Sequence, residues 1–128
     1  MTFIVLNGSP KGEHSITLQY VRFLQKKFPQ HEFKTIHVSQ KIKKIEKDEE
    51  TFMKIIEEVR SSDGVFWCFG LWVLVVAAQY MRFIELISER GVEDAFRDKY
   101  TAALSTSIHY YDHTAHNYIR AVCEDLGM

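Results

Sequence analysis

Short apolar runs alternate along the chain with segments of helical spacing, and this alternation constrains the fold more than any other feature. The first run, residues 3–6, is continuously apolar with β-branched members, and the turn sequence of residues 7–10 ends it. A strand buried on both faces of a sheet has this pattern. Residues 33–38 alternate between apolar and polar side chains and predict a second strand with one polar face, and residues 65–69 and 101–105 predict two further strands. Helical spacing covers residues 16–28, 48–61, 76–89 and 111–126.

Strict alternation of strand and helix with short connections predicts an α/β fold, in which helices cover both faces of a parallel sheet. The length of 128 residues predicts a single domain over residues 1–128. A chain of this size buries roughly two-thirds of the surface that its unfolded form exposes. Neither a disulfide nor a structural metal is therefore expected to be needed.

The charge balance argues against two classes of partner. The 16 basic and 17 acidic residues give a net charge of −1, which disfavours nucleic-acid binding by phosphate neutralisation and a polybasic membrane anchor. No signal peptide is expected, and the apolar stretch of residues 65–78 is interrupted by Gly70 and too short to span a bilayer. Cys68 and Cys123 form no metal-binding motif and fit a reducing cytoplasm.

Ligands of open parallel sheets bind beyond the carboxyl ends of the strands. The first such loop, residues 7–17, joins a buried strand to a helix N-terminus, where free backbone N–H groups favour an anion. Ser9, Ser15 and Thr17 add hydroxyl donors, so a phosphate monoester is one interpretation. A plain turn with Ser15 as the helix cap is the other. The loop has neither a dinucleotide-binding glycine pattern nor a Walker lysine.

The second and third loops also have unusual compositions. Residues 70–75 are apolar, although a loop at this position is normally polar. A planar ring or a partner subunit would cover them, or they belong to the core. Residues 105–111 are rich in hydroxyl and imidazole groups. They would hydrogen-bond the polar edge of a ring or a substrate, or simply cap the following helix.

Three histidines overlap the third loop. His109, His113 and His116 are spaced by four and three residues, with Asp112 between them. On one continuous helix they would share a face and bind a transition metal. No fourth ligand is recognisable, however, and His109 precedes the helix. A hydrogen-bond or substrate contact near a redox ring is the favoured interpretation, so no metal site is expected.

Taken together, these features resemble the flavodoxin-like NAD(P)H-dependent FMN reductase and quinone reductase superfamily. Residues 78–85 are similar to that family's G-Q-x-K-x-F-I-D helix, and the similarity runs over essentially the whole chain. The other segments that carry it are residues 3–11, 15–17, 62–72, 100–107 and 126–128.

The resemblance implies a three-layer α/β/α sandwich of sheet order 2-1-3-4 that binds FMN. Residues of the first loop would hold the phosphate, and residues of the second would line the isoalloxazine ring. Residues of the third would approach the pyrimidine side, and His109 would assist the chemistry. These residues are, in that order, Ser9, Lys11, Ser15, Ile16 and Thr17; Gly70, Leu71, Trp72 and Val73; Thr106, Ser107 and His109.

The sequence departs from the family's pattern in two respects. Gly70 and Trp72 occupy the ends of a P-x-Y motif that often follows the third strand, which puts tight flavin binding in doubt. The usual fifth strand and fifth helix are missing, which leaves strand four as an apolar sheet edge. Either the chain is a shortened form or another chain covers that edge.

We therefore expect an FMN-dependent oxidoreductase that takes hydride from NAD(P)H and reduces flavin, a quinone or a similar small-molecule acceptor. It is expected to be cytoplasmic and a homodimer or higher homo-oligomer, with the Trp72 loop near the interface. Two alternatives remain open. One is a flavodoxin-like electron carrier, which the charge of −1 disfavours. The other is a shortened, non-catalytic interaction domain.

Overall fold

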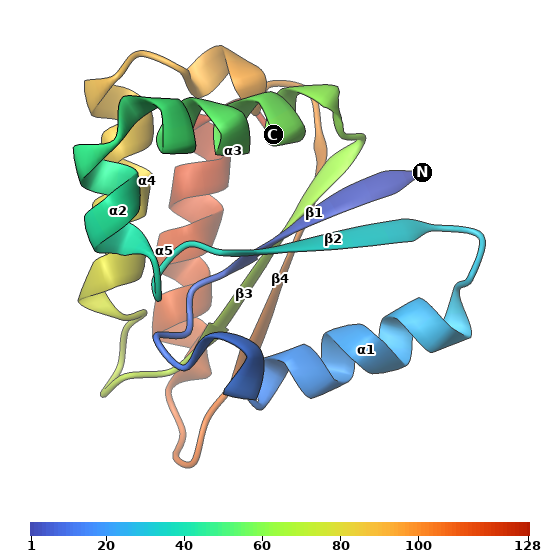
Figure 1. Cartoon of the computed structure of the whole chain (residues 1–128). Coiled ribbons are helices and arrows are strands. Elements are labelled where there is room, and N and C mark those ends of the chain that lie inside the picture. The colour runs from blue at the N-terminus through green and yellow to red at the C-terminus, as the bar shows by residue number, and fades with distance from the viewer.

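The computed structural model describes residues 1–128 and contains one four-stranded parallel sheet (Figure 1). The strand order is β2-β1-β3-β4, and every neighbouring pair is parallel. The expected fold class and the order 2-1-3-4 are thus confirmed. The strands are β1 (Thr2–Asn7), β2 (Glu32–His37), β3 (Gly64–Gly70) and β4 (Tyr100–Thr106).

Helices form a layer on each face of this sheet, but the two layers are unequal. Helix α1 lies alone on one face, and α2 to α5 lie on the other (Figure 1). The helices are α1 (Thr17–Lys27), α2 (Ile42–Lys47), α3 (Glu49–Ser61), α4 (Ala78–Glu89) and α5 (Asp112–Asp125), with single 3-10 turns η1 (Gly12–His14) and η2 (Glu93–Ala95). No helix combines the length and apolar character that a membrane crossing requires.

The buried core has the same asymmetry. A cluster of 24 buried residues fills the space between the sheet and α2 to α5, and it includes Trp67, Tyr80 and Phe83. Beneath α1 the buried cluster has only four members, which are Val5, Leu18, Val21 and Cys68. Most of the hydrophobic stabilisation therefore comes from one side of the sheet.

One element differs from expectation. A single helix was expected over residues 48–61, whereas the structure also forms α2 immediately before it. Ile42 and Ile45 are buried against the core, so the preceding segment is helical as well. Asp48 separates the two helices with an extended backbone, and its carboxylate accepts a hydrogen bond of 2.6 Å from the Thr51 hydroxyl.

Tyr80 fastens α4 to the central strand. Its side chain is fully buried, and its hydroxyl donates a hydrogen bond of 2.7 Å to the Leu6 carbonyl oxygen. The ring lies against the backbone of Gly8, where a Cβ atom would overlap it. The start of the first ligand loop, at Gly8, therefore packs against the buried Tyr80 ring.

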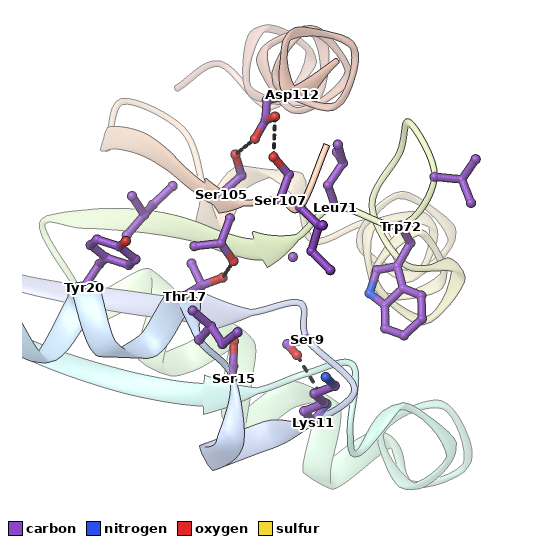
Figure 2. Close-up of a pocket in the computed structure, with 16 residues that line it drawn as sticks. Ser9, Lys11, Ser15, Thr17, Tyr20, Leu71, Trp72, Ser105, Ser107 and Asp112 are labelled. Carbon is purple, nitrogen blue, oxygen red and sulfur yellow. Dashed lines mark hydrogen bonds between the residues drawn. The ribbon is translucent and has the colours of Figure 1, made fainter. Parts of the chain in front are cut away.

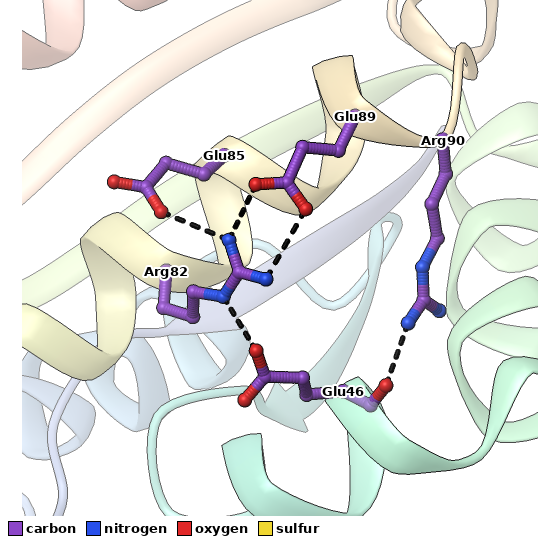
Figure 3. A network of polar contacts seen from close by, with 5 residues as sticks. All are labelled: Glu46, Arg82, Glu85, Glu89 and Arg90. Carbon is purple, nitrogen blue, oxygen red and sulfur yellow. Dashed lines mark hydrogen bonds and ion pairs between the residues drawn. The ribbon is translucent and has the colours of Figure 1, made fainter.

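An arginine network joins α2 to α4 (Figure 3). The Arg82 guanidinium binds Glu46 of α2 at 2.7 Å, Glu89 at 2.6 Å and Glu85 at 3.0 Å. Hydrogen bonds to Glu89, Glu46 and Glu85 raise the pKa of Arg82. Arg90 donates to the Glu46 carbonyl oxygen at 2.7 Å and lies over the Phe52 ring. Because these groups face solvent, the network orients α2 more than it stabilises the fold.

The contact between Gly8 and Tyr80 predicts a large difference between two glycine substitutions. Gly8→Ala should lower the free energy of unfolding by about 1–3 kcal/mol, because the new methyl group meets a buried ring. Gly70→Ala is the matched control, since nothing lies within 4 Å of its Cβ position, and it should change stability by less than about 0.5 kcal/mol. Urea denaturation measures both, and equal losses would contradict the assigned contact.

Candidate functional site

A pocket of about 780 Å³ lies at the carboxyl ends of β1, β3 and β4 (Figure 2). It is formed by the three loops that the topology brings to this edge of the sheet. Eleven of the twelve residues expected at a cofactor site line it: Ser9, Lys11, Ser15, Ile16, Thr17, Gly70, Leu71, Trp72, Val73, Thr106 and Ser107.

His109 is the expected site residue that does not line this pocket. It lies instead at an adjoining apolar cavity of about 340 Å³, together with Leu74 and Tyr110. The main pocket has five further lining residues that the sequence did not single out for the site, namely Tyr20, Leu104, Ser105, Ile108 and Asp112.

The first loop forms a polar wall with unused donors. The backbone N–H groups of Ile16 and Thr17 make no hydrogen bond within the protein, because they precede the first full turn of α1. The Ser15 side chain is almost completely buried, and its hydroxyl has no partner in the protein. Lys11 is the only cation that lines the pocket, and it forms no ion pair. Such a wall suits an anion.

The Thr17 hydroxyl already has two partners within the protein. It lies 3.1 Å from the Phe69 carbonyl oxygen. It also lies 2.8 Å from the Thr106 hydroxyl, a contact drawn as a dashed line at Thr17 in Figure 2. A carbonyl oxygen can only accept, so Thr17 donates to Phe69 and the Thr106 hydroxyl donates to Thr17. This chain of hydrogen bonds ties α1 to β3 and β4. Only the backbone N–H of Thr17 remains free to bind a ligand.

The second loop forms an apolar wall. Trp72 and Val75 exchange backbone hydrogen bonds of 2.8 and 3.2 Å, which close a tight turn. At the tip of this turn Val73 has a φ of 52°, an unfavourable conformation for a β-branched residue. The side chain of Val73 is 89% exposed and that of Trp72 is 49% exposed. Apolar groups held outward at this cost are expected to contact a ligand or a partner.

The third loop presents one carboxylate to the pocket (Figure 2). Asp112, the first residue of α5, accepts hydrogen bonds from the hydroxyls of Ser107 at 2.6 Å and Ser105 at 3.0 Å. These two bonds hold the pKa of Asp112 below its usual value. The Ser105 hydroxyl donates its one hydrogen bond to this carboxylate. His116 Nε2, at 2.8 Å, therefore donates to the Ser105 oxygen.

The histidines of this region do not form a metal site. No group of three or more His, Cys, Asp or Glu side chains lies close enough to hold a metal ion. His116 is hydrogen-bonded to Ser105, and the His113 ring lies beside that of Tyr111. His113 and His116 therefore contact different neighbours and do not share one site.

Lys11 and Asp112 are the only charged residues among those that line the pocket, and they belong to different walls (Figure 2). The pocket is accordingly basic beside the first loop and acidic beside the third, with an apolar wall from Leu71 to Val73. A ligand with an anionic end and a flat, largely apolar body is complementary to this arrangement.

Several solved structures share the fold of this chain. The flavoenzyme NAD(P)H:(acceptor) oxidoreductase FerB from Paracoccus denitrificans has a TM-score of 0.78 and 18% identity, over 98% of this chain and 72% of FerB. The apo form of the NADH:FMN oxidoreductase EMOB has a TM-score of 0.76 and 14% identity, over 99% of this chain and 70% of that one. At these identities the similarity concerns the fold.

An FMN-dependent NADH-azoreductase from Bacillus anthracis str. Ames Ancestor, solved in complex with FMN, is also similar. Its TM-score is 0.67 at 10% identity, and the match covers 100% of this chain and 83% of that chain. A search of curated protein sequences found no match. In contrast, the sequence model of the NADPH-dependent FMN reductase family matches residues 1–128. The chain therefore belongs to the NADPH-dependent FMN reductase family.

Proposed function

We propose that the pocket binds FMN, with the phosphate against the first loop and the ring system between the second and third loops. One observation carries this proposal: a single pocket combines unpaired N–H donors and Lys11 at one wall with the exposed apolar wall of Leu71 and Trp72. FMN is a phosphate monoester joined to a planar ring, so it is complementary to both walls. The volume of about 780 Å³ lies within the range of cofactor pockets.

The proposed contacts follow the walls. Ser9, Lys11, Ser15 and the N–H groups of Ile16 and Thr17 would hold the phosphate. The ring would lie against Gly70, Leu71, Trp72 and Val73, with Thr106 and Ser107 at its polar edge. His109, from the adjoining cavity, is proposed to meet the pyrimidine side of the ring or the acceptor.

Bound FMN supplies the redox chemistry of this family, which takes hydride from NAD(P)H and passes electrons to an acceptor. The protein's own contribution is to orient the ring and to limit the access of water. Trp72, Val73 and Ile108 give the mouth of the pocket an apolar rim. That rim favours a small, flat acceptor such as a quinone or a second flavin.

The direct test is the visible spectrum of the protein after incubation with FMN and removal of free flavin. Retained flavin bands, followed by flavin-dependent NAD(P)H oxidation with a quinone, would support the proposal. Protein that stays colourless at saturating FMN would refute it.

Lys11 provides a matched test of the phosphate position. Lys11→Met should weaken FMN binding about three- to tenfold, because it removes a charge-assisted contact, and should leave riboflavin binding unchanged. Lys26→Met is the control, since Lys26 is an exposed cation of α1 that does not line the pocket. Fluorescence titration measures both affinities. Equal weakening of FMN and riboflavin would place the phosphate elsewhere.

Asp112 should affect the redox potential of bound FMN. A carboxylate held ionised in the pocket disfavours negative charge on the reduced ring. Asp112→Asn should therefore raise the midpoint potential by roughly 30 mV, a tenfold change for a two-electron couple. Asp125→Asn, at the other end of α5, should leave the potential unchanged. A potential that moves equally in both variants, or falls in Asp112→Asn, would contradict this role.

We also infer a homodimer in a reducing compartment, the cytoplasm. Val73 and Ile108 of the apolar rim are 89% and 96% exposed, and Tyr110 of the adjoining cavity is 86% exposed. Burial of this rim against a second copy would remove it from water. Free, buried Cys68 and Cys123 support the compartment.

The oligomer prediction is tested by sedimentation. Ile108→Ser should shift the protein from dimer toward monomer, because Ile108 is the most exposed residue of the rim. Phe23→Ser, at a 61% exposed apolar residue of α1 outside the rim, is the control and should not change the mass. A wild-type monomer at micromolar concentration would refute the dimer.

A further inference from the structure

The first loop is held in shape from within by Asn7, the last residue of β1. Asn7 is completely buried, and its side-chain carbonyl accepts a hydrogen bond of 3.1 Å from the Ser9 N–H. Its amide nitrogen donates to the Gly12 carbonyl oxygen, also at 3.1 Å. One side chain thus spans the turn that ends at Gly12, whose φ of 57° requires glycine.

The second amide hydrogen of Asn7 points to β2. Asn7 Nδ2 lies 2.9 Å from His37 Nδ1, and His37 is the last residue of β2. The bonds to Ser9 and Gly12 fix which end of the amide is nitrogen, so Asn7 donates and His37 Nδ1 accepts. His37 Nε2 lies 2.6 Å from a Glu13 carboxylate oxygen, which can only accept. In this arrangement His37 accepts from Asn7 at Nδ1 and donates to Glu13 from Nε2.

The contacts of His37 lead back to the first loop through Glu13. Glu13 belongs to η1, and its other carboxylate oxygen binds Arg22 of α1 at 2.9 Å. The hydrogen bond with His37 is the largest cause of the lowered pKa of Glu13. His37 thus contacts the loop at two points, through Asn7 beneath it and through Glu13 at η1. His37 itself does not line the pocket.

We propose that His37 is a positioning residue that shapes the first loop for a phosphate monoester and so sets the preference for FMN over riboflavin. The inference rests on the proposed function, because that function puts the phosphate at this loop. The imidazole does not touch the ligand. It holds Asn7 and Glu13 so that Ser9, Lys11 and Ser15 keep their places around the anion.

The test compares two variants of His37. His37→Phe keeps a ring of similar size but loses both hydrogen bonds. His37→Gln presents a carbonyl oxygen to Asn7 and an N–H to Glu13. His31→Phe is the matched control, since His31 precedes β2 at its opposite end. Affinities for FMN and riboflavin are measured by fluorescence titration, and amide hydrogen exchange is followed at Ser9 and Gly12 in the ligand-free proteins.

We expect His37→Phe to weaken FMN binding about five- to tenfold, the effect of one to two lost hydrogen bonds, with riboflavin unchanged. His37→Gln should restore most of the difference, and exchange at Ser9 should quicken only in His37→Phe. Equal loss of both flavins, an unaltered FMN affinity, or no rescue by glutamine would overturn the proposal.

If the wild type binds neither flavin, the proposed function fails by that result alone. Amide exchange then decides the structural role of His37. Faster exchange at Ser9 in His37→Phe supports loop positioning, and unchanged exchange overturns it.

Discussion

The parallel register of the three strands β1, β2 and β3 is the constraint on which the site depends. Asn7 pairs with His37 of β2 on one side and with Cys68 of β3 on the other. β1 and β2 therefore end at one level, β3 continues past it to Gly70, and the loops that follow the three strands start from one edge of the sheet. A slip of β2 by one residue would turn the His37 side chain to the opposite face of the sheet. The first loop would then lose its contact with β2.

Much of this arrangement could be predicted from the sequence, because apolar runs mark buried strands and the alternation with helices determines the topology. Because the carboxyl ends of parallel strands meet at one edge of the sheet, the three loops that form the pocket could also be predicted. Helix α2 was not predicted, since it has six residues in a highly charged stretch and depends on burial of Ile42 and Ile45. Asp112 was missed as a site residue because its serine partners lie across a loop, and only the folded chain brings them together.

Hydroxyl groups in the ligand loops illustrate a more general limit. In sequence, the serines and threonines of these loops are equivalent donors. In the structure, the hydroxyls of Thr17 and Thr106 join a helix to two strands, and those of Ser105 and Ser107 orient a carboxylate. Only some of them are free of partners within the protein, and the backbone N–H groups at the start of α1 are free as well. Composition alone therefore overstates how many hydroxyls a loop can offer.

The solitary position of α1 has a consequence for how the molecule opens. The buried cluster between this helix and the sheet has four residues, two of them from the helix itself, against 24 in the cluster on the other face. Units with few buried apolar contacts exchange with solvent by local opening, at a lower free energy than global unfolding. The N-terminus of α1 forms part of the pocket, so a ligand bound there stabilises the weaker side of the sheet by mass action. A bound cofactor would thus add contacts on the side of the sheet that has few buried residues. The proteins with and without cofactor should differ most in how often α1 opens locally to solvent.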